Sequence, residues 1–245
     1  MPDDRDRQRA WEEAGFFVVR SWFGQHQVRA LAEACDHALS QMRAASTVVG
    51  HTTTHVSGFL IPEYFSARPD ALALLLEFVS SPAVLMLVRD LGRPFEGELD
   101  LRDIQYFHEP TARDYDGAWH RDGEIPALIE DETAAHRATS LRYRVAFAAD
   151  DHLEYVPRSH VRADTQEERR LRTGPVRNAE LASGSERIVL EPGDVCVFDT
   201  WGIHRARYRQ GTARRTLDLR FGFGARKFSR TALTELRKRL RAGQL

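Results

Sequence analysis

Apolar positions in the first 94 residues recur mostly at helical spacing. Over residues 25–42 they return every three or four positions, which is typical of a helix with one buried face. Two more helices are predicted over about 71–80 and 81–91, because Asp70 and Ser81 can each cap a helix N-terminus. The stretch 45–60, rich in Thr, Ser, His and Gly, is predicted to be a loop. The sequence therefore favours a mainly helical first part.

From about residue 97 the apolar positions instead recur with the period of two that strands show. Further strands are predicted at 16–19, 141–148, 187–190, 195–198 and 215–223. Turn signals separate them, among them Asp150-Asp151 and Pro192-Gly193. Short strands with regular turns favour an antiparallel barrel or jelly roll, so the fold class is α+β and mostly β. We expect one domain over 1–245, with a helical part (1–94), a β core (95–225) and a C-terminal helix (226–245).

Composition narrows the classes of partner. The chain has 245 residues and a formal net charge of −1, which favours neither nucleic acid nor a membrane surface. Its two cysteines, Cys35 and Cys196, do not make a disulfide framework, so a reducing cytoplasm is expected. The most apolar stretch, 71–88, is interrupted by Glu77 and Pro82, so it is interpreted as buried helix and not as a membrane span. The oligomeric state is left open.

Candidate metal ligands stand at His120, Asp122 and His204. On a strand, positions 120 and 122 point to the same face and Arg121 to the other, so one strand can supply two adjacent ligands. His204 comes shortly after an apolar strand, where a neighbouring strand would begin, and can approach from a second direction. Two imidazoles and one carboxylate are the facial ligand set of non-haem Fe(II). With no cysteine nearby, a structural zinc site is disfavoured.

An arginine pair, Arg214-Arg215, precedes the last predicted strand. Positions 215, 217, 219, 221 and 223 are Arg, Leu, Leu, Phe and Phe, and this apolar face is expected to point into the barrel. A buried guanidinium needs an anionic partner, and a dicarboxylate co-substrate held at two points is one such partner. Arg215 is therefore predicted to bind it, and Arg214 to lie outside near Asp218. Alternatively, Arg215 pairs with an internal carboxylate such as Asp103, or the register is shifted by one.

The order of these motifs resembles the phytanoyl-CoA hydroxylase family of Fe(II)/2-oxoglutarate-dependent dioxygenases. The resemblance rests on Glu12 to Phe16, on Trp119-His120-Arg121-Asp122, on the turn Val156 to His160, on Pro192 to Phe198, on His204 and on Arg215. It spans nearly the whole chain. One departure is Arg158, where the family usually has glycine in its Val-Pro-Gly-Ser-His turn. Another is the segment 124–140, which matches nothing in the pattern.

The resemblance implies a double-stranded β-helix that binds Fe(II), 2-oxoglutarate and O2. His120, Asp122 and His204 would hold the iron, and Arg215 the far carboxylate of 2-oxoglutarate. Gln105 lies on a strand from which the family often sends a polar residue towards 2-oxoglutarate; a hydrogen bond within the barrel is the other interpretation. The family's reaction releases succinate and CO2 and by default hydroxylates a substrate, here expected to be a small metabolite.

Two other functions remain open from the sequence. The first is a metal-dependent, cupin-like enzyme that uses the same three ligands without 2-oxoglutarate. The second is a non-catalytic binding module on the same barrel. The outcome of an oxidation is also open, because desaturation, epoxidation and ring closure need the same ligand set as hydroxylation.

Overall fold

The structure is a computed structural model, which describes residues 4–45, 54–89, 91, 99–110, 113–122, 140–181 and 184–223. Its helices are α1 (Asp4–Ala14), α2 (Gln25–Ala44), α3 (Pro69–Val79), α4 (Pro82–Val88) and α5 (Gln166–Thr173). Its strands are β1 (Phe16–Val19), β2 (His55–Ser57), β3 (Leu99–His108), β4 (Tyr115–Asp116), β5 (Ser140–Ala146), β6 (Asp150–Tyr155), β7 (Glu186–Leu190), β8 (Val195–Asp199), β9 (His204–Tyr208) and β10 (Arg215–Phe223). The expected C-terminal helix and nearly all of the segment 124–140 lie outside the described residues.

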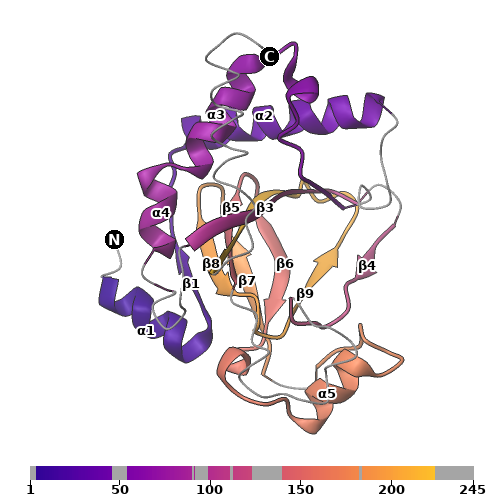
Figure 1. The fold of residues 1–245 in the computed structure, drawn as a ribbon. Coiled ribbons are helices and arrows are strands. Elements are labelled where there is room, and N and C mark those ends of the chain that lie inside the picture. Colours follow the sequence, from indigo (N-terminus) through magenta and orange to yellow (C-terminus); the bar gives the residue numbers. More distant parts are fainter. Residues whose placement is uncertain are drawn as a thin grey trace.

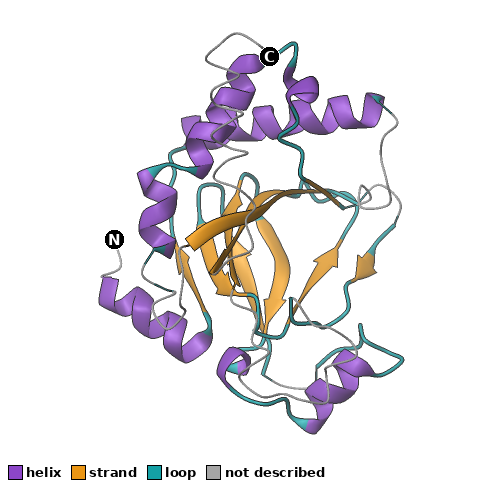
Figure 2. Ribbon diagram, in the orientation of Figure 1, coloured by secondary structure: helices purple, strands orange, loops and turns teal. Residues whose placement is uncertain are grey.

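Two antiparallel sheets form the core, as Figures 1 and 2 show. The larger sheet has the order β1-β8-β5-β10-β3-β2 and the smaller one β4-β9-β6-β7. Two facing antiparallel sheets whose strands alternate along the chain make a jelly roll, so the predicted fold class is confirmed. The apolar alternation did not predict β2, β4 or β6, and it gave no bounds for β9, which begins at His204 where a neighbouring strand was expected. The loop expected over 45–60 is wrong at β2, and the turn expected at Asp150-Asp151 is wrong because β6 begins there.

The helices α1 to α4 lie against the outer face of the larger sheet (Figure 1). On β10, Leu217 and Leu219 point into the large apolar core beneath these helices, whereas Thr216 and Asp218 are buried on the opposite, inner face. The same alternation continues on β5, where Tyr143 joins the core under the helices. The apolar stripe of β10 is therefore on the outer face, while a second apolar cluster joins Cys196 and Phe198 of β8 to Leu153 and Tyr155 of β6 in the smaller sheet.

Of the two predicted helix caps, Ser81 is confirmed and Asp70 is wrong, because α3 begins at Pro69 after Arg68 and Asp70 lies within its first turn. The helix α5 was not predicted. The Ser81 hydroxyl accepts a hydrogen bond from the amide of Val84 at 3.3 Å, and Pro82 occupies the first turn of α4. The predicted helix to Leu91 ends earlier, at Val88. The segment Pro69–Val88 is long and apolar enough to cross a membrane by length and composition alone. It forms the two helices α3 and α4, many of whose side chains are buried in the core.

Arg158 occupies the turn in which the family usually has glycine. Its φ is 66°, in the left-handed region that a Cβ atom disfavours by about 1–2 kcal/mol. The turn forms nevertheless, because the Arg158 amide donates to Ala14 O at 3.0 Å and its carbonyl accepts from the Val161 amide at 3.2 Å. Arginine in place of glycine at position 158 therefore adds backbone strain without removing the turn.

Replacing Arg158 with glycine should raise the free energy of unfolding by about 0.5–1 kcal/mol. Relief of the left-handed strain exceeds the extra chain entropy that glycine loses on folding. Chemical denaturation of the purified protein measures the difference. Arg158→Ala is the matched control, since it removes the same side chain but keeps the Cβ atom. If both variants were stabilised equally, the effect would belong to the side chain and not to the backbone.

Candidate active site

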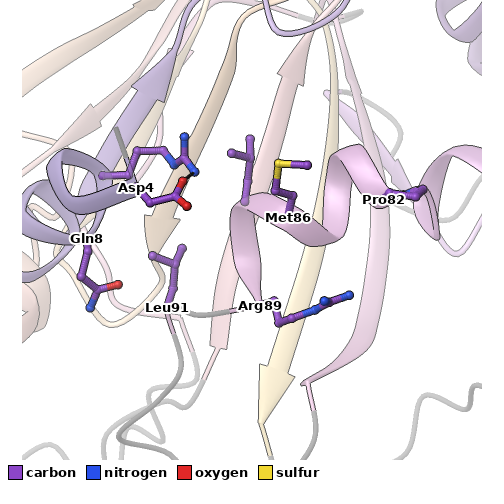
Figure 3. Close-up of a pocket in the computed structure, with 8 residues that line it drawn as sticks. Asp4, Gln8, Pro82, Met86, Arg89 and Leu91 are labelled. Atoms are coloured by element: carbon purple, nitrogen blue, oxygen red, sulfur yellow. Dashed lines mark hydrogen bonds and ion pairs between the residues drawn. The ribbon is translucent and has the colours of Figure 1, made fainter. Parts of the chain in front are cut away.

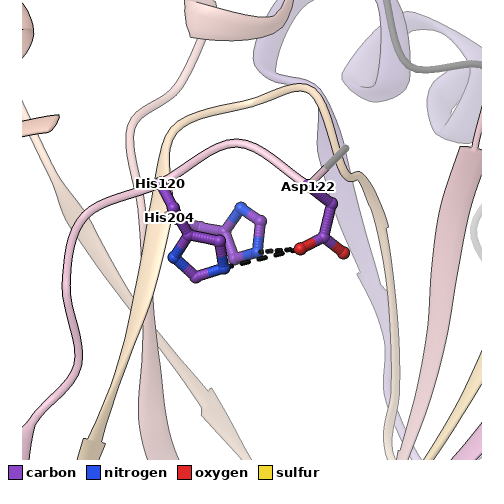
Figure 4. A group of neighbouring side chains, drawn as sticks. All are labelled: His120, Asp122 and His204. Carbon is purple, nitrogen blue, oxygen red and sulfur yellow. Dashed lines mark ion pairs between the residues drawn. The ribbon is translucent and has the colours of Figure 1, made fainter. Parts of the chain in front are cut away.

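The three predicted ligands lie together inside the barrel (Figure 4). His120 and His204 face each other across an isolated antiparallel bridge, in which each amide donates to the other residue's carbonyl at 3.0 Å. Asp122 Oδ1 lies 3.5 Å from His120 Nε2 and 3.9 Å from His204 Nε2. All three candidate ligand atoms lie within 4.8 Å of one another. Arg121 points to the opposite side and pairs with Asp164 at 2.5 Å, as the spacing predicts. The expected strand is absent here, because His120 forms an isolated bridge and Asp122 lies in a turn.

In both imidazole rings Nε2 is the nitrogen that can bind a metal where the three ligand atoms converge. His120 Nδ1 lies 2.8 Å from Ala118 O, and His204 Nδ1 lies 2.8 Å from Gly202 O. A carbonyl oxygen can only accept, so Nδ1 carries the proton in each ring and Nε2 is free to bind a cation. Burial and the neighbouring His120 lower the pKa of His204 to about 3, so this ring is neutral at physiological pH.

The carboxylate of Asp122 is kept ionised. Burial alone would raise its pKa, but Arg142 and the two imidazoles outweigh burial and hold the pKa well below its usual range. The Arg142 Nε donates to Asp122 Oδ2 at 2.9 Å. Two imidazoles and one carboxylate, with no cysteine among these three, form a donor set that suits Fe(II). The side chain of His120 is 39% exposed and that of His204 only 6%, so the site opens on the side of His120.

The arginine pair lies opposite to the way that the alternation predicted. Arg214 is buried, at 1% exposure, and its guanidinium carbon lies over the rings of Phe107 (4.8 Å) and Tyr208 (4.9 Å). Its Nε lies 3.7 Å from Asp150 Oδ2, yet none of its three side-chain nitrogens has a hydrogen-bond partner. A buried guanidinium in this state is costly without an anionic ligand.

Arg215 lies on the outside. Its side chain is 50% exposed and its Nη2 pairs with Asp36 on α2 at 2.7 Å. The prediction that Arg215 occupies the buried inner face is therefore wrong. The apolar stripe that it shares with Leu217 and Leu219 faces the helices, and the barrel interior is lined by the polar stripe. Both faces of β10 are covered, so burial alone did not identify the inner one.

The polar inner stripe of β10 meets further charged groups on β5, where the sequence left open which parity lines the pocket. Arg144 Nε and Nη2 donate to the two carboxylate oxygens of Asp218, each at 2.8 Å. Thr216 is fully buried and its hydroxyl has no hydrogen-bond partner. A signal was present in the sequence: positions 214, 216 and 218 are all polar, and a strand covered on both faces keeps such a stripe only where it meets other polar groups.

Gln105 lies on the inner face of β3, as expected, but its amide is already engaged. Its Oε1 accepts a hydrogen bond from Arg142, and its Nε2 donates to Ser57 Oγ at 3.0 Å. Two tryptophans flank the ligand histidines and make packing contacts. Trp119 is buried, and its indole nitrogen donates to Ala179 O at 3.0 Å. The guanidinium carbon of Arg121 lies 5.4 Å from the Trp201 ring.

A pocket elsewhere in the molecule contains none of these residues. It lies between α1 and α4 and is lined by Asp4, Arg7, Gln8, Pro82, Met86, Leu87, Arg89 and Leu91 (Figure 3). Nothing in its lining repeats the donor set of the barrel interior. The barrel is thus the candidate active site.

Comparison with known proteins agrees with this geometry. Residues 11–217 match the phytanoyl-CoA dioxygenase (PhyH) family. The chain belongs to this family. Its members are non-haem iron and 2-oxoglutarate-dependent oxygenases, so the predicted class of enzyme and its cofactors, Fe(II), 2-oxoglutarate and O2, are confirmed. No curated protein matches the sequence.

Solved structures share the fold of this PhyH-family chain at low sequence identity. AviO1 from Streptomyces viridochromogenes Tue57 is 14% identical with a TM-score of 0.65, over 93% of this chain and 98% of that one. HygX from Streptomyces hygroscopicus, solved with nickel and 2-oxoglutarate, is 16% identical with a TM-score of 0.61, over 90% and 87%. EctD from S. alaskensis, solved with 2-oxoglutarate and 5-hydroxyectoine, is 16% identical with a TM-score of 0.61, over 90% and 76%.

Proposed function

We propose that this PhyH-family oxygenase hydroxylates a small-molecule metabolite, with His120, Asp122 and His204 as the ligands of Fe(II). We further propose that Arg214, and not Arg215, holds the far carboxylate of 2-oxoglutarate. One observation carries the second assignment: Arg214 is a buried guanidinium without a hydrogen-bond partner, inside the barrel that contains the metal ligands. The hydroxyl of Thr216, two residues along the same face, is equally available.

The charges inside the barrel fit these two cofactors. Three guanidinium groups face three carboxylates there, at Arg142, Arg144, Arg214, Asp122, Asp150 and Asp218. These named groups balance one another, so an iron(II) ion adds two uncompensated positive charges. A dianion such as 2-oxoglutarate cancels them. Because charges in a buried site are expensive to leave uncompensated, metal and co-substrate should bind with mutual support.

Different residues of the chain bind the metal and position the co-substrate. When bound, Fe(II) and 2-oxoglutarate supply the oxidising chemistry with O2, and 2-oxoglutarate is converted to succinate and CO2. His120 and His204 direct Nε2 at the metal position, since Nδ1 of each ring donates to a backbone carbonyl, and Asp122 supplies the negative charge. Arg214 binds the far carboxylate of 2-oxoglutarate and so orients the co-substrate. The substrate approaches from the open side, next to the partly exposed His120.

A small molecule is the class of substrate that we propose, in line with EctD, whose structure contains 5-hydroxyectoine. The chain's near-neutral charge also gives a large polyanion no long-range attraction. The cytoplasm remains the proposed location, since Cys35 and Cys196 are both free and buried.

Turnover of 2-oxoglutarate tests the function directly. The purified protein with Fe(II), ascorbate and O2 should release succinate slowly without substrate and faster with a correct metabolite from a panel. His120→Ala under the same conditions is the control and should release none. A hydroxylated product with one added oxygen atom supports the proposed reaction. If product formation required the metal but not 2-oxoglutarate, the protein would instead be a cupin-like enzyme of another class.

A further inference from the structure

We infer that Arg142 is a positioning residue that decides which oxygen of Asp122 the metal can use. The inference rests on the proposed metal site and deepens it. Arg142 holds Oδ2, so that the carboxylate offers only Oδ1 to the iron. Arg142 is itself held by Gln105, and Gln105 by Ser57. We call these three residues the Ser57–Gln105–Arg142 relay.

The two oxygens of Asp122 have different surroundings. Oδ1 lies 3.5 Å from His120 Nε2 and 3.9 Å from His204 Nε2, on the side where the three ligand atoms converge. Oδ2 accepts the hydrogen bond from Arg142 Nε at 2.9 Å. A charge-assisted bond of this length fixes the rotation of the carboxylate. A metal held here would therefore meet one oxygen of Asp122, and the second oxygen would not compete with co-substrate or O2 for it.

Arg142 is well anchored for such a role. Its side chain is 12% exposed, and its Nη1 lies 3.6 Å from Asp218 Oδ2. Burial alone would lower the pKa of Arg142, but Asp122 and Asp218 outweigh burial and raise it. The residue lies on β5, paired with Phe198 on β8 and with Arg220 on β10. A side chain set in the middle of a sheet has little freedom to move away from Asp122.

Gln105 extends the anchoring to the edge of the sheet. A guanidinium can only donate, so the Gln105 oxygen faces Arg142 and the Gln105 nitrogen must donate, which it does to Ser57 Oγ at 3.0 Å. Ser57 is on β2, the edge strand that pairs with β3. The role of Gln105 in this relay is thus to position Arg142, and it does not require contact with 2-oxoglutarate.

The relay has a consequence that can be measured without turnover. If Asp122 is replaced by glycine, the Arg142 guanidinium is left facing an empty ligand position. A small carboxylate such as formate can then take both places that Asp122 filled, one oxygen on the metal and one on Arg142. Hydrogen bonds to charged groups contribute about 1.5–3 kcal/mol, which is roughly tenfold or more in affinity.

Calorimetric titration with Co(II), a redox-stable probe, tests the inference in the full-length protein. In Asp122→Gly, formate should strengthen Co(II) binding by roughly tenfold or more, and the visible spectrum of bound Co(II) should change with formate. In Asp122→Gly/Arg142→Met, formate should have no effect. The matched control is Asp122→Gly/Arg20→Met, which removes a different carboxylate-paired arginine, held by Asp194 at 2.6 Å. It should keep the formate effect.

An equal formate effect with and without Arg142 would overturn the inference. Circular dichroism checks the fold of each variant. If the Arg142→Met double variant does not fold, Asp122→Gly/Gln105→Leu replaces it, and its formate effect should fall severalfold because Arg142 loses its support. An unchanged effect there would remove Gln105 from the relay. Failure of the parent protein to bind Co(II) would refute the proposed metal site itself, which is a separate result.

Discussion

His120→Ala should abolish stoichiometric Fe(II) binding while the fold survives. The variant loses one of three protein ligands. Losing a residue that only hydrogen-bonds to a metal ligand already costs about 10- to 100-fold in metal affinity, so a loss of more than about 100-fold is expected. His204→Ala should lose iron equally. The two variants differ in stability, because His204 is buried against Phe198, at 5.3 Å between ring centroids, and its removal leaves a cavity.

His120→Ala is therefore the cleaner test of the metal site. Anaerobic calorimetry with Fe(II) gives the stoichiometry and affinity, and chemical denaturation confirms that the fold is intact. His26→Ala is a suitable control, since His26 is an exposed residue of α2. Iron binding at the parental level in His120→Ala or His204→Ala would show that the residue is not a ligand.

Arg214→Ala should raise the Michaelis constant for 2-oxoglutarate by roughly 30-fold or more and leave Fe(II) binding intact. Removing one partner of a buried, hydrogen-bonded charge pair costs about 2–5 kcal/mol. Arg215→Ala is the matched control on the neighbouring position. It removes a half-exposed ion pair with Asp36, and pairs of that kind contribute little. Arg214→Lys should restore only part of the affinity, because an ammonium cannot make the planar two-point contact.

Thermal stability gives a second, independent readout, with Arg214→Met compared with Arg215→Ala. Without co-substrate, Arg214→Met should destabilise the protein, because it leaves the buried carboxylate of Asp150, whose Oδ2 lies 3.7 Å from Arg214 Nε, without that positive charge. Saturating 2-oxoglutarate with a metal ion should raise the melting temperature of the parent and of Arg215→Ala, but not that of Arg214→Met. A large rise in the Michaelis constant for 2-oxoglutarate in Arg215→Ala, with a small rise in Arg214→Ala, would show that Arg215 and not Arg214 binds the co-substrate.

The outcome for the arginine pair shows where strand alternation stops being informative. The period of two correctly separated Arg214 from Arg215 and put Leu217 and Leu219 on one face. It did not say which face meets the barrel interior. The helices α1 to α4 cover the larger sheet from outside, so the apolar stripe of β10 faces them, while its inner face carries paired charges such as Asp218, which binds Arg144. A rule that apolar residues point inwards gives the opposite result in such a barrel.

Strands dominated by charge were also beyond the sequence pattern. β6 reads Asp-Asp-His-Leu-Glu-Tyr and β9 reads His-Arg-Ala-Arg-Tyr. Their charged residues are stabilised by one another across the smaller sheet, as when Arg205 Nε donates to Glu154 at 2.5 Å. Such pairs form only after both strands are in place, so neither strand shows the apolar alternation by which strands are recognised.

By itself the sequence determined the fold class and the three candidate metal ligands. His120 and Asp122 lie on one side because they are two apart on an extended segment, and this depends on local backbone geometry alone. The tertiary structure decided which arginine enters the barrel, and it brought Arg142 and Gln105 to Asp122. Those relations depend on which layer covers each sheet face and on the register between distant strands, and no local spacing encodes either of them.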